Sequence, residues 1–479
     1  FIIVSAVIGT GVFTGNGNAL AVAGPVGLLL NVAGVGLVAI CVAETLSELN
    51  QLWTVPSAVY FYIKHFVDTE AAWVVTALYW YSYSAIFAVQ MLGAANLVQY
   101  WDLAAIWPPF IFYLLVPALL LFINLNSVEI YGWIEMAFGM LKVLLIFGVT
   151  CLLFDISTKS EFRLSPQKGS VDSVYGIPHV AYSYIGIESS VVAAFESARP
   201  QSVARPSRVV HWVIFVLYFL CSLGIALTVR WDDPHLTQPL VSLSNPRSNS
   251  ATIIAIAKDP RLRLTPISGF LNGCLIMSTV SAAAVSLYIA GRTLYGLSYS
   301  VSLRGGNWIS AAFKGLSSVW RATNVPAIAL FVSVVAFCWL PWLSEAPDGK
   351  GVAMKDVLDV LELTASMSCI ITWAFLCLAF IRFRSLTKKC EGSPAETIDR
   401  LGLSKYISSE GGYGAKGIGV AFQPLPAITG FLGCLIICIS ASAPWWDRPA
   451  RTRDVLAAYS PVSIPLPTPP PSPSRPWLR

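Results

Sequence analysis

The sequence predicts an all-α polytopic membrane protein, and three observations lead to this fold class. Hydrophobic residues make up 56% of the 479 residues and charged residues only 12%, whereas water-soluble proteins carry about twice that charged share. The apolar residues occur in runs of about 20, the length with which a helix crosses a hydrocarbon core of ~30 Å. Two of these runs contain glycine-bearing interruptions, which predict helices that break within the membrane.

The same composition excludes several classes of function. The formal net charge of +5 is small for this length and indicates neither a nucleic acid nor an acidic partner. Nine of the ten cysteines lie in apolar runs and no C-x-x-C occurs, so we expect neither a disulfide nor a metal site. No G-x-S-x-G, H-E-x-x-H or P-loop motif is present. We therefore expect no enzyme and no cofactor.

Taken in order, the apolar runs predict eleven membrane spans. The first covers residues 1–23, and a Gly24-Pro25 turn leads to the second at residues 26–43. The others are expected at residues 72–100, 108–124, 130–154, 175–196, 209–229, 267–297, 327–343, 358–383 and 426–442. Loops rich in arginine and lysine alternate with mixed or acidic loops, so the positive-inside rule predicts a cytoplasmic N-terminus.

The first span is interrupted at Gly9-Thr10-Gly11. Each glycine weakens a helix by roughly 1 kcal/mol relative to alanine, so we expect the helix to break here. Freed backbone groups in lipid need protein or a water-lined cavity around them, which makes the break a candidate binding site. A small-residue patch for helix packing is an alternative. A dinucleotide loop is a weaker one, because the third glycine comes at position 15 rather than 14 and no soluble α/β unit is indicated.

A second interruption follows in the sixth span, where residues 182–186 read YSYIG. The two interruptions lie five spans apart. Paired discontinuous segments at matching positions of two halves are typical of inverted-repeat transporters, and they indicate the binding site.

Two ionisable residues lie within spans, where each costs several kcal/mol unless it lines a cavity or has a partner. Lys142 stands twelve residues into the fifth span, about 18 Å along it at ~1.5 Å per residue, and snorkelling to an interface is the alternative. Glu188 follows the second interruption, and a helix-end carboxylate facing the cytoplasm is its alternative. Interfacial, solvated or capping positions are expected for Glu44, Glu48, His179 and His211.

Four motifs occur in order along the chain. They read IGTGVF at 8–13 with ALAxAGPxG at 19–27, YGxxE at 131–135 with KV at 142–143, SYxGxE at 183–188 with ESARP at 196–200, and SAA, SLY and RTLY within 281–295. Together they resemble the amino acid permeases of the amino acid–polyamine–organocation superfamily, most closely the fungal-type branch. The resemblance covers nearly the whole chain.

This resemblance implies a leucine-transporter-type fold, a 5+5 inverted repeat with discontinuous helices 1 and 6. The permease domain would cover residues 1–443, with repeats at approximately 1–154 and 175–383. We expect residues to precede Phe1, and a twelfth helix cut short by prolines. Residues 444–479 would then be an aberrant or disordered proline-rich tail.

The resemblance also implies roles for named residues. Backbone amides of the first interruption would receive the substrate carboxylate, and backbone carbonyls of the second would receive its ammonium group; the residues concerned are Ile8, Gly9, Thr10, Gly11, Tyr182, Ser183, Tyr184 and Gly186. Lys142 would occupy the place where sodium-coupled relatives bind a cation. Lys142 and Glu188 would serve proton coupling.

The predicted function is secondary active transport of amino acids, by proton-coupled symport with alternating access. The expected partners are the amino acid, protons and the lipid bilayer, and the expected location is the plasma membrane. Oligomeric state is not indicated. A transporter-like amino acid sensor is the alternative, because Gln90 stands where the family usually has an acidic residue, and glutamine cannot carry a proton.

Overall fold

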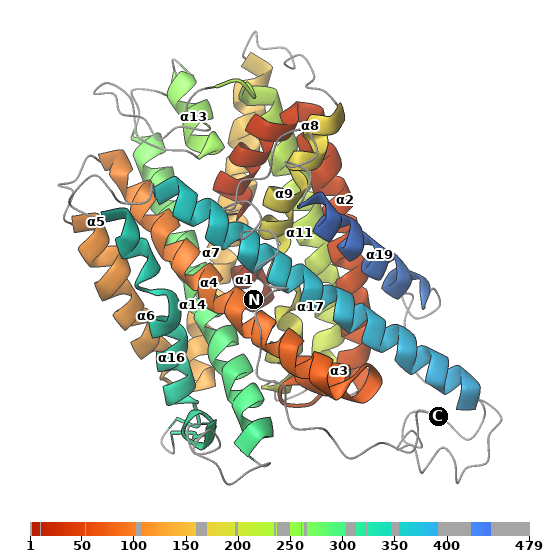
Figure 1. Ribbon diagram of the computed structural model, residues 1–479. Coiled ribbons are helices and arrows are strands. Elements are labelled where there is room, and N and C mark those ends of the chain that lie inside the picture. Colours follow the sequence, from red (N-terminus) through yellow and green to blue (C-terminus); the bar gives the residue numbers. More distant parts are fainter. Residues whose placement is uncertain are drawn as a thin grey trace.

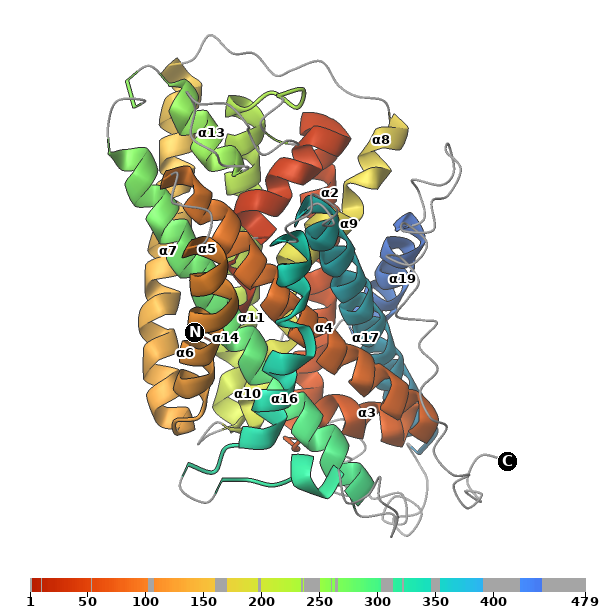
Figure 2. The ribbon, with the colours of Figure 1, turned by 60° about the vertical axis from the view of Figure 1, so that its left-hand side comes forward.

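The chain forms a bundle of helices in the computed structural model (Figures 1 and 2). The structure describes residues 2–9, 11–52, 54–101, 107–159, 170–196, 200–233, 236, 250–259, 261–262, 266–302, 313–320, 323–345, 354–390 and 423–441. Within these ranges there is no β-strand, only an isolated bridge between Trp320 and Val325. The proline-rich tail at 444–479 and the expected start of a twelfth helix lie outside the described residues.

Six long helices make up most of the bundle. They are α2 (Asn16–Leu52), α4 (Thr69–Val98), α7 (Val128–Lys159), α11 (Pro200–Thr228), α14 (Ile267–Ser302) and α17 (Met354–Cys390). Shorter elements join them: α1 (Ile2–Val7), η1 (Gly11–Gly15), α3 (Ala58–Phe66), η2 (Gln99–Trp101), α5 (Trp107–Phe110), η3 (Ile111–Leu115), α6 (Val116–Asn124), α8 (Ser170–Tyr175), α9 (Ile177–Tyr184), η4 (Ile187–Ser189), α10 (Ser190–Phe195), α13 (Ala251–Lys258), α16 (Ala327–Phe337), η5 (Leu340–Glu345) and α19 (Leu425–Ser440).

These helices carry the length and apolar character of membrane spans. Six described segments are long and apolar enough to cross a bilayer, and three shorter apolar helices lie at Pro108–Asn124, Ala327–Trp342 and Leu425–Ser440. All nine fall where the sequence predicts spans; the count of eleven stays a prediction. Large apolar side chains are exposed along α7 and α11, including Trp133 (64%), Leu144 (65%) and Val209 (64%). An apolar surface of this kind is what contact with lipid requires.

The chain turns sharply between its first two predicted spans. Gly24 has φ 74° and ψ 177°, a conformation that glycine adopts without a Cβ clash, and Pro25 follows it. The element labelled α2 therefore consists of two helices that meet at this turn. Beyond the turn, the side-chain amide of Asn31 donates to the Ser173 carbonyl oxygen of α8 over 2.7 Å.

Helix α4 lies at the centre of the bundle and packs against α14 and α17. It is apolar around most of its circumference, as a helix with neighbours on all sides must be. Asp68 caps its start by accepting hydrogen bonds from the backbone amides of Glu70 (2.7 Å) and Ala71 (3.2 Å). Ser82 donates to the Ala365 carbonyl oxygen of α17 over 2.7 Å, which sets the register between the two helices.

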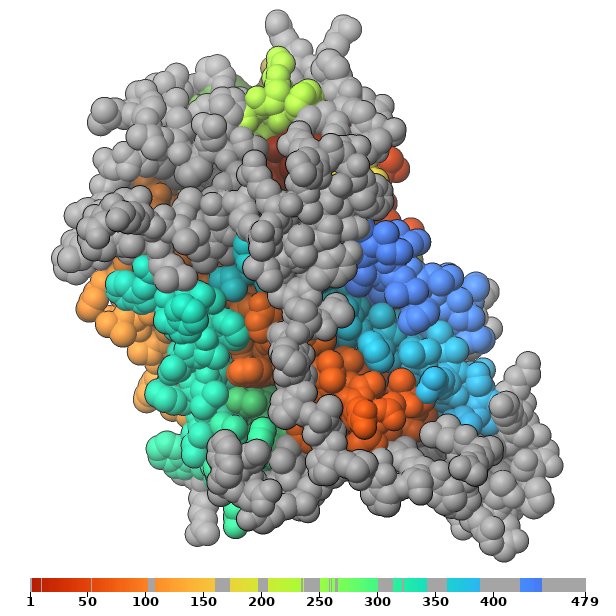
Figure 3. All heavy atoms as spheres, in the orientation of Figure 1, coloured from red at the N-terminus to blue at the C-terminus, as the bar shows by residue number. Residues whose placement is uncertain are grey.

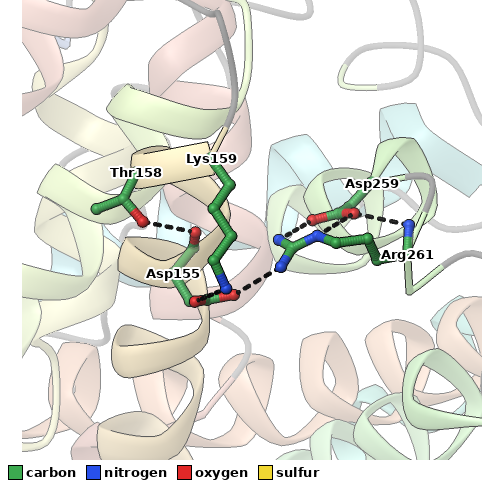
Figure 4. A network of polar contacts seen from close by, with 5 residues as sticks. All are labelled: Asp155, Thr158, Lys159, Asp259 and Arg261. Atoms are coloured by element: carbon green, nitrogen blue, oxygen red, sulfur yellow. Dashed lines mark hydrogen bonds and ion pairs between the residues drawn. The ribbon is translucent and has the colours of Figure 1, made fainter.

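On one face of the molecule, α17 lies between α19 and α3, as Figure 3 shows. At the opposite end from α3, a polar network joins the end of α7 to the segment after α13 (Figure 4). Asp155 accepts from Lys159 (2.5 Å) and from Arg261 (3.3 Å), and Arg261 also pairs with Asp259 at 2.7 Å. The hydrogen bonds from Arg261 lower the pKa of the Asp259 carboxyl. Exposed pairs of this kind each contribute about 0–1 kcal/mol, so the network orients α13 more than it stabilises the fold.

Two glycines of α2 offer a matched test of the packing between α2 and α11. A Cβ on Gly36 would lie 2.5 Å from the Phe215 ring and 2.6 Å from the Tyr184 hydroxyl, whereas a Cβ on Gly34 would meet nothing within 4 Å. We expect Gly36→Ala to lower the free energy of unfolding by about 1–3 kcal/mol, since it overpacks this contact. Gly34→Ala should leave stability unchanged or raise it. Thermal unfolding of the two variants in detergent decides this, and equal midpoints would contradict the packing described.

Candidate functional site

The first predicted span is interrupted in the structure. Helix α1 ends at Val7, Ile8 and Gly9 form a bend, and the π-helical turn η1 begins at Gly11. Thr10 lies outside the described residues. A break here leaves carbonyl oxygens without the amide donors of a continuing helix.

Side chains of three other helices donate to carbonyl oxygens at this break. Tyr218 of α11 donates to Val7 O over 2.7 Å, and Ser278 of α14 donates to Ile8 O over 3.2 Å. The Nζ of Lys142, on α7, donates to Ser5 O over 2.8 Å. The unwound backbone is thus held by protein, as a non-helical segment at membrane depth must be.

The sixth predicted span is interrupted as well. Helix α9 ends at Tyr184, Ile185 is extended, and Gly186 has φ 111° before the 3₁₀ turn η4 leads into α10. Only glycine adopts this φ readily. A Cβ on Gly186 would also lie 2.8 Å from the carbonyl carbon of Ala6, so this glycine allows the two interrupted segments to approach each other.

The two interruptions meet at Gly11 and Ser183. A Cβ on Gly11 would come 2.6 Å from the Cα of Ser183, closer than two such atoms can lie. The Ser183 side chain is buried, and its hydroxyl has no hydrogen-bond partner within the described part of the chain. A buried hydroxyl without a partner costs about 1–3 kcal/mol, and a ligand group at this point would remove that cost.

A small central pocket lies beside this junction. It is lined by Ala6, Val7, Gly11, Tyr83, Ile86, Gln90, Tyr182, Ile185 and Ser286. Its volume is about 10 Å³, which is about the room that one water molecule needs. The pocket is therefore closed in this structure, with room for nothing much larger than a water molecule.

The predicted substrate-binding residues are distributed around this pocket in different ways. Gly11 and Tyr182 line it. Ile8, Gly9, Ser183 and Gly186 are buried close to it without forming its wall. The Tyr184 side chain points elsewhere, because its hydroxyl donates to Val32 O of α2 over 3.1 Å.

Sequence reasoning singled out Gln90 of α4 but did not predict Tyr83 and Ile86 of the same helix as site residues. Tyr83, Ile86 and Gln90 line the pocket from this helix, and Gln90 Nε2 lies 3.5 Å from the Tyr182 hydroxyl. These three residues have the spacing i, i+3, i+7, which places them on one face of a helix. The sequence shows that these residues share a face, but nothing in it distinguishes this face of α4 from the other buried faces.

Lys142 has no exposed surface, and its ammonium group bonds inside the protein rather than reaching an interface. The snorkelling alternative therefore does not describe this residue. Two turns earlier on α7, the Glu135 carboxylate accepts from Ser281 of α14 over 3.2 Å. The Ser5 hydroxyl donates to Glu135 O over 3.3 Å. Ser5 thus contacts α7 with both its carbonyl oxygen and its side chain.

Glu188 is also fully buried, so the alternative of a carboxylate facing the cytoplasm is wrong. Its carboxylate accepts from the Tyr83 hydroxyl, from Trp373 Nε1 (2.9 Å), from Cys369 Sγ (3.3 Å) and from the Gly186 amide (3.2 Å). Donors from α4 and α17 thus converge on the turn that interrupts the sixth span. Because these donors come from α4, from α17 and from the turn itself, Glu188 holds the three segments together.

Of the four other ionisable residues expected at span ends, Glu48 and His211 depart from that expectation, whereas Glu44 and His179 remain partly exposed. Glu48 is fully buried instead of interfacial. His211 is buried instead of solvated, with Nε2 3.2 Å from Ile187 O. Glu44 pairs with Arg208 of α11 at 2.8 Å. His179 remains partly exposed and lies 3.7 Å from Glu362 of α17.

The contribution of the donors around Glu188 is testable. We expect Tyr83→Phe to lower the free energy of unfolding by about 1–3 kcal/mol, because it removes a donor from the buried Glu188 carboxyl group. Tyr60→Phe is the matched control, since the buried Tyr60 hydroxyl has no partner among the described residues. Thermal unfolding midpoints measure both, and equal stability of the two variants would contradict the role given to Tyr83.

Comparison with known families matches residues 1–400 to the family described as "Amino acid permease". The chain is 26% identical to cationic amino acid transporter 1 of Schizosaccharomyces pombe, covering 87% of this chain and 68% of that protein. It is 26% identical to the tryptophan permease of Saccharomyces cerevisiae, covering 92% and 69%. It is 27% identical to a general amino-acid permease of Candida albicans, covering 79% and 62%. The resemblance predicted from the motifs is confirmed.

Among solved structures, the fold is similar to that of a manganese transporter from Eremococcus coleocola. The TM-score is 0.56 at 12% sequence identity, and the match covers 96% of this chain and 90% of that one. At such low identity the likeness concerns the fold alone. The predicted class, an all-α polytopic transporter fold, is confirmed.

Proposed function

The chain belongs to the amino acid permease family, and we propose that it carries amino acids across a membrane by proton-coupled symport with alternating access. The family and its transporter relatives indicate a transporter rather than an enzyme. The observation that supports the proposal best is the pocket at the junction of the two interrupted helices.

That junction suits a zwitterion. The C-terminal ends of α1 and α9 carry partial negative charge, whereas the starts of η1 and η4 carry partial positive charge. A carboxylate group would bind at the amides near Gly11, and an ammonium group at the carbonyls near Ser183. The unpartnered Ser183 hydroxyl adds one more group for hydrogen bonding.

The closed pocket supports alternating access. A site of about 10 Å³ must enlarge to admit an amino acid, and the close contact of Gly11 with Ser183 must loosen when it does. Opening toward one side of the membrane and then the other would carry the substrate across.

Lys142 is the group we assign to coupling, with Glu188 as the second candidate. A protonated Lys142 binds Ser5 O through a charge-assisted hydrogen bond, roughly twice as strong as a neutral one. Loss of its proton would weaken the tie between α7 and α1, the helix that forms one wall of the site. Substrate movement and proton movement would then depend on the same contact.

The proposed location is the plasma membrane, with the N-terminus in the cytoplasm. The loop charges support this orientation: Arg304, Lys314 and Arg321 have no acidic neighbour within residues 298–324.

Uptake into proteoliposomes tests the proposal. A panel of the labelled ordinary L-amino acids, offered with and without a pH gradient, should include at least one that accumulates. Gly11→Leu should abolish both binding and uptake, because its Cβ would collide with the Ser183 backbone. Gly148→Leu, where a Cβ would meet nothing within 4 Å, should retain both. Binding by the Gly11 variant within a few-fold of the parental chain would remove the junction as the site.

Lys142→Gln separates coupling from recognition. It keeps a hydrogen-bond donor of similar size but cannot change its charge. We expect the variant to retain amino acid exchange between preloaded vesicles and to lose the accumulation driven by a pH gradient. Both assays are run on one preparation, with Lys159→Gln as the control, because that lysine is exposed at the end of α7. Accumulation at the parental level in Lys142→Gln would exclude this residue from coupling.

A second candidate function is that of an amino acid sensor, which binds without transporting. Gln90 favours it, since this neutral residue lines the central pocket beside Tyr182. A parental chain that binds an amino acid but neither exchanges nor accumulates it would support the sensor over the transporter.

A further inference from the structure

A second cavity, of about 200 Å³, lies apart from the central pocket. Its walls come from the segment before α3, from α4, α10 and α14, and from the segment before α16. In Figure 2 these elements lie at the end of the bundle that carries α3, away from α13. This end is the predicted cytoplasmic side. By the measure in which one water molecule needs about 10–15 Å³, this cavity has more than ten times that room.

A tyrosine pair separates this cavity from the central pocket. Tyr83 lines the central pocket and Tyr79, one turn earlier on α4, lines the second cavity. Their ring centroids are 5.0 Å apart, edge to face. The hydrogen bond from Tyr83 to Glu188 fixes this partition against η4. A single turn of α4 therefore lies between the two pockets, with Tyr83 bordering the central pocket and Tyr79 bordering the second cavity.

Two opposite charges stand on the wall of the cavity. Arg292 of α14 donates from Nε to the Glu196 carboxylate over 2.5 Å, and the side chains are only 11% and 21% exposed. The guanidinium lies 3.5 Å over the ring of Tyr288, which itself stacks on Tyr131 with centroids 4.9 Å apart. The Tyr288 hydroxyl donates to the other oxygen of Glu196. The pair is held rigidly in place.

This pair keeps unused hydrogen-bonding capacity. Arg292 has five N–H donors. One binds Glu196 and another reaches Tyr288 O at 3.5 Å, and the rest have no acceptor among the described residues. Each Glu196 oxygen accepts one hydrogen bond and has a second lone pair. The wall can therefore bind a carboxylate at Arg292 and an ammonium group at Glu196 without separating the ion pair.

Apolar side chains complete the cavity. Val191 and Val192 of α10, together with Val55 and Val59, also line the cavity. A cavity wall that carries a cation, an anion and apolar side chains offers contacts to the carboxylate, the ammonium group and the side chain of an amino acid.

We propose that this cavity is a second amino acid station, in which Glu196 and Arg292 hold the substrate between the central pocket and the α3 end of the bundle. The proposal rests on the proposed transport function. It adds Glu196 and Arg292 to the pathway. It also predicts that each chain binds two amino acids, one in the central pocket and a second, more weakly held, in the cavity beside this ion pair.

Equilibrium dialysis of the full purified chain against each of the twenty labelled L-amino acids, up to millimolar concentration, counts the bound molecules. We expect two equivalents for the parental chain. Arg292→Gln, Glu196→Gln and the cavity-filling Val192→Trp should retain the central equivalent and bind the second about tenfold more weakly or not at all, because each loses a charged contact or the space itself. In proteoliposomes, the same variants should release substrate more slowly from the α3 side.

Arg208→Gln is the matched control. Arg208 and Glu44 form a similar ion pair, with side chains 15% and 17% exposed, which no wall of either pocket includes. This variant should bind two equivalents. The three test substitutions change different contacts, and unfolding midpoints identify any variant that is merely unstable.

The outcomes separate the two proposals. A parental chain that saturates at one equivalent, or test variants that match Arg208→Gln in stoichiometry and release, would overturn the second station while leaving the transport function standing. A parental chain that binds no amino acid would overturn both.

Discussion

Backbone groups freed inside a membrane have no water to bind, so a helix that breaks there must find its partners in the protein. The break after α1 meets this constraint with donors from α7, α11 and α14, namely Lys142, Tyr218 and Ser278. The break between α9 and α10 meets it through Glu188, which collects donors from α4 and α17. The positions of five long helices thus follow from two short irregular segments.

The same constraint explains why charged residues lie deep within the bundle. Burying a lysine or a glutamate costs several kcal/mol unless hydrogen bonds compensate. Lys142 and Glu188 each take part in holding an interrupted segment in place, so their structural and proposed coupling roles coincide. A change of charge at either residue would alter the contacts of the helix ends that form the central pocket. In the proposed mechanism, a change in the protonation of Lys142 or Glu188 would therefore act directly on the shape of the central pocket.

The central pocket and the larger cavity are both lined by residues of α4. This helix is buried on nearly all sides, and its residues Tyr79 and Tyr83 face different compartments. In the proposed transport cycle, a closed central pocket beside a larger, charged cavity would correspond to a central site shut between two conformations. The ion pair of Glu196 and Arg292 faces the cavity rather than lipid, because both side chains line the cavity wall.

The sequence by itself determined the membrane class, the positions of the apolar helices, the family and the two places where helices break. Each of these depends on local composition: runs of apolar residues, glycines within them, and motifs in order along the chain. Deep positions of Lys142 and Glu188 were predictable for the same reason, since span ends are readable from the sequence. Their partners were not, because Ser5, Tyr83 and Trp373 are far from them along the chain.

Only the tertiary structure decided which faces of α4 meet the site, that Glu48 and His211 are buried, and that Tyr184 points toward α2 rather than the pocket. Hydrophobic periodicity identifies the inner face of a helix only when its outer face is polar. A helix surrounded by neighbours, such as α4, is apolar on every side, so its sequence does not indicate which face meets the site. The pairing of Glu196 with Arg292 was hidden for a related reason: 96 residues separate them, and only the folded chain brings the residue that follows α10 to α14.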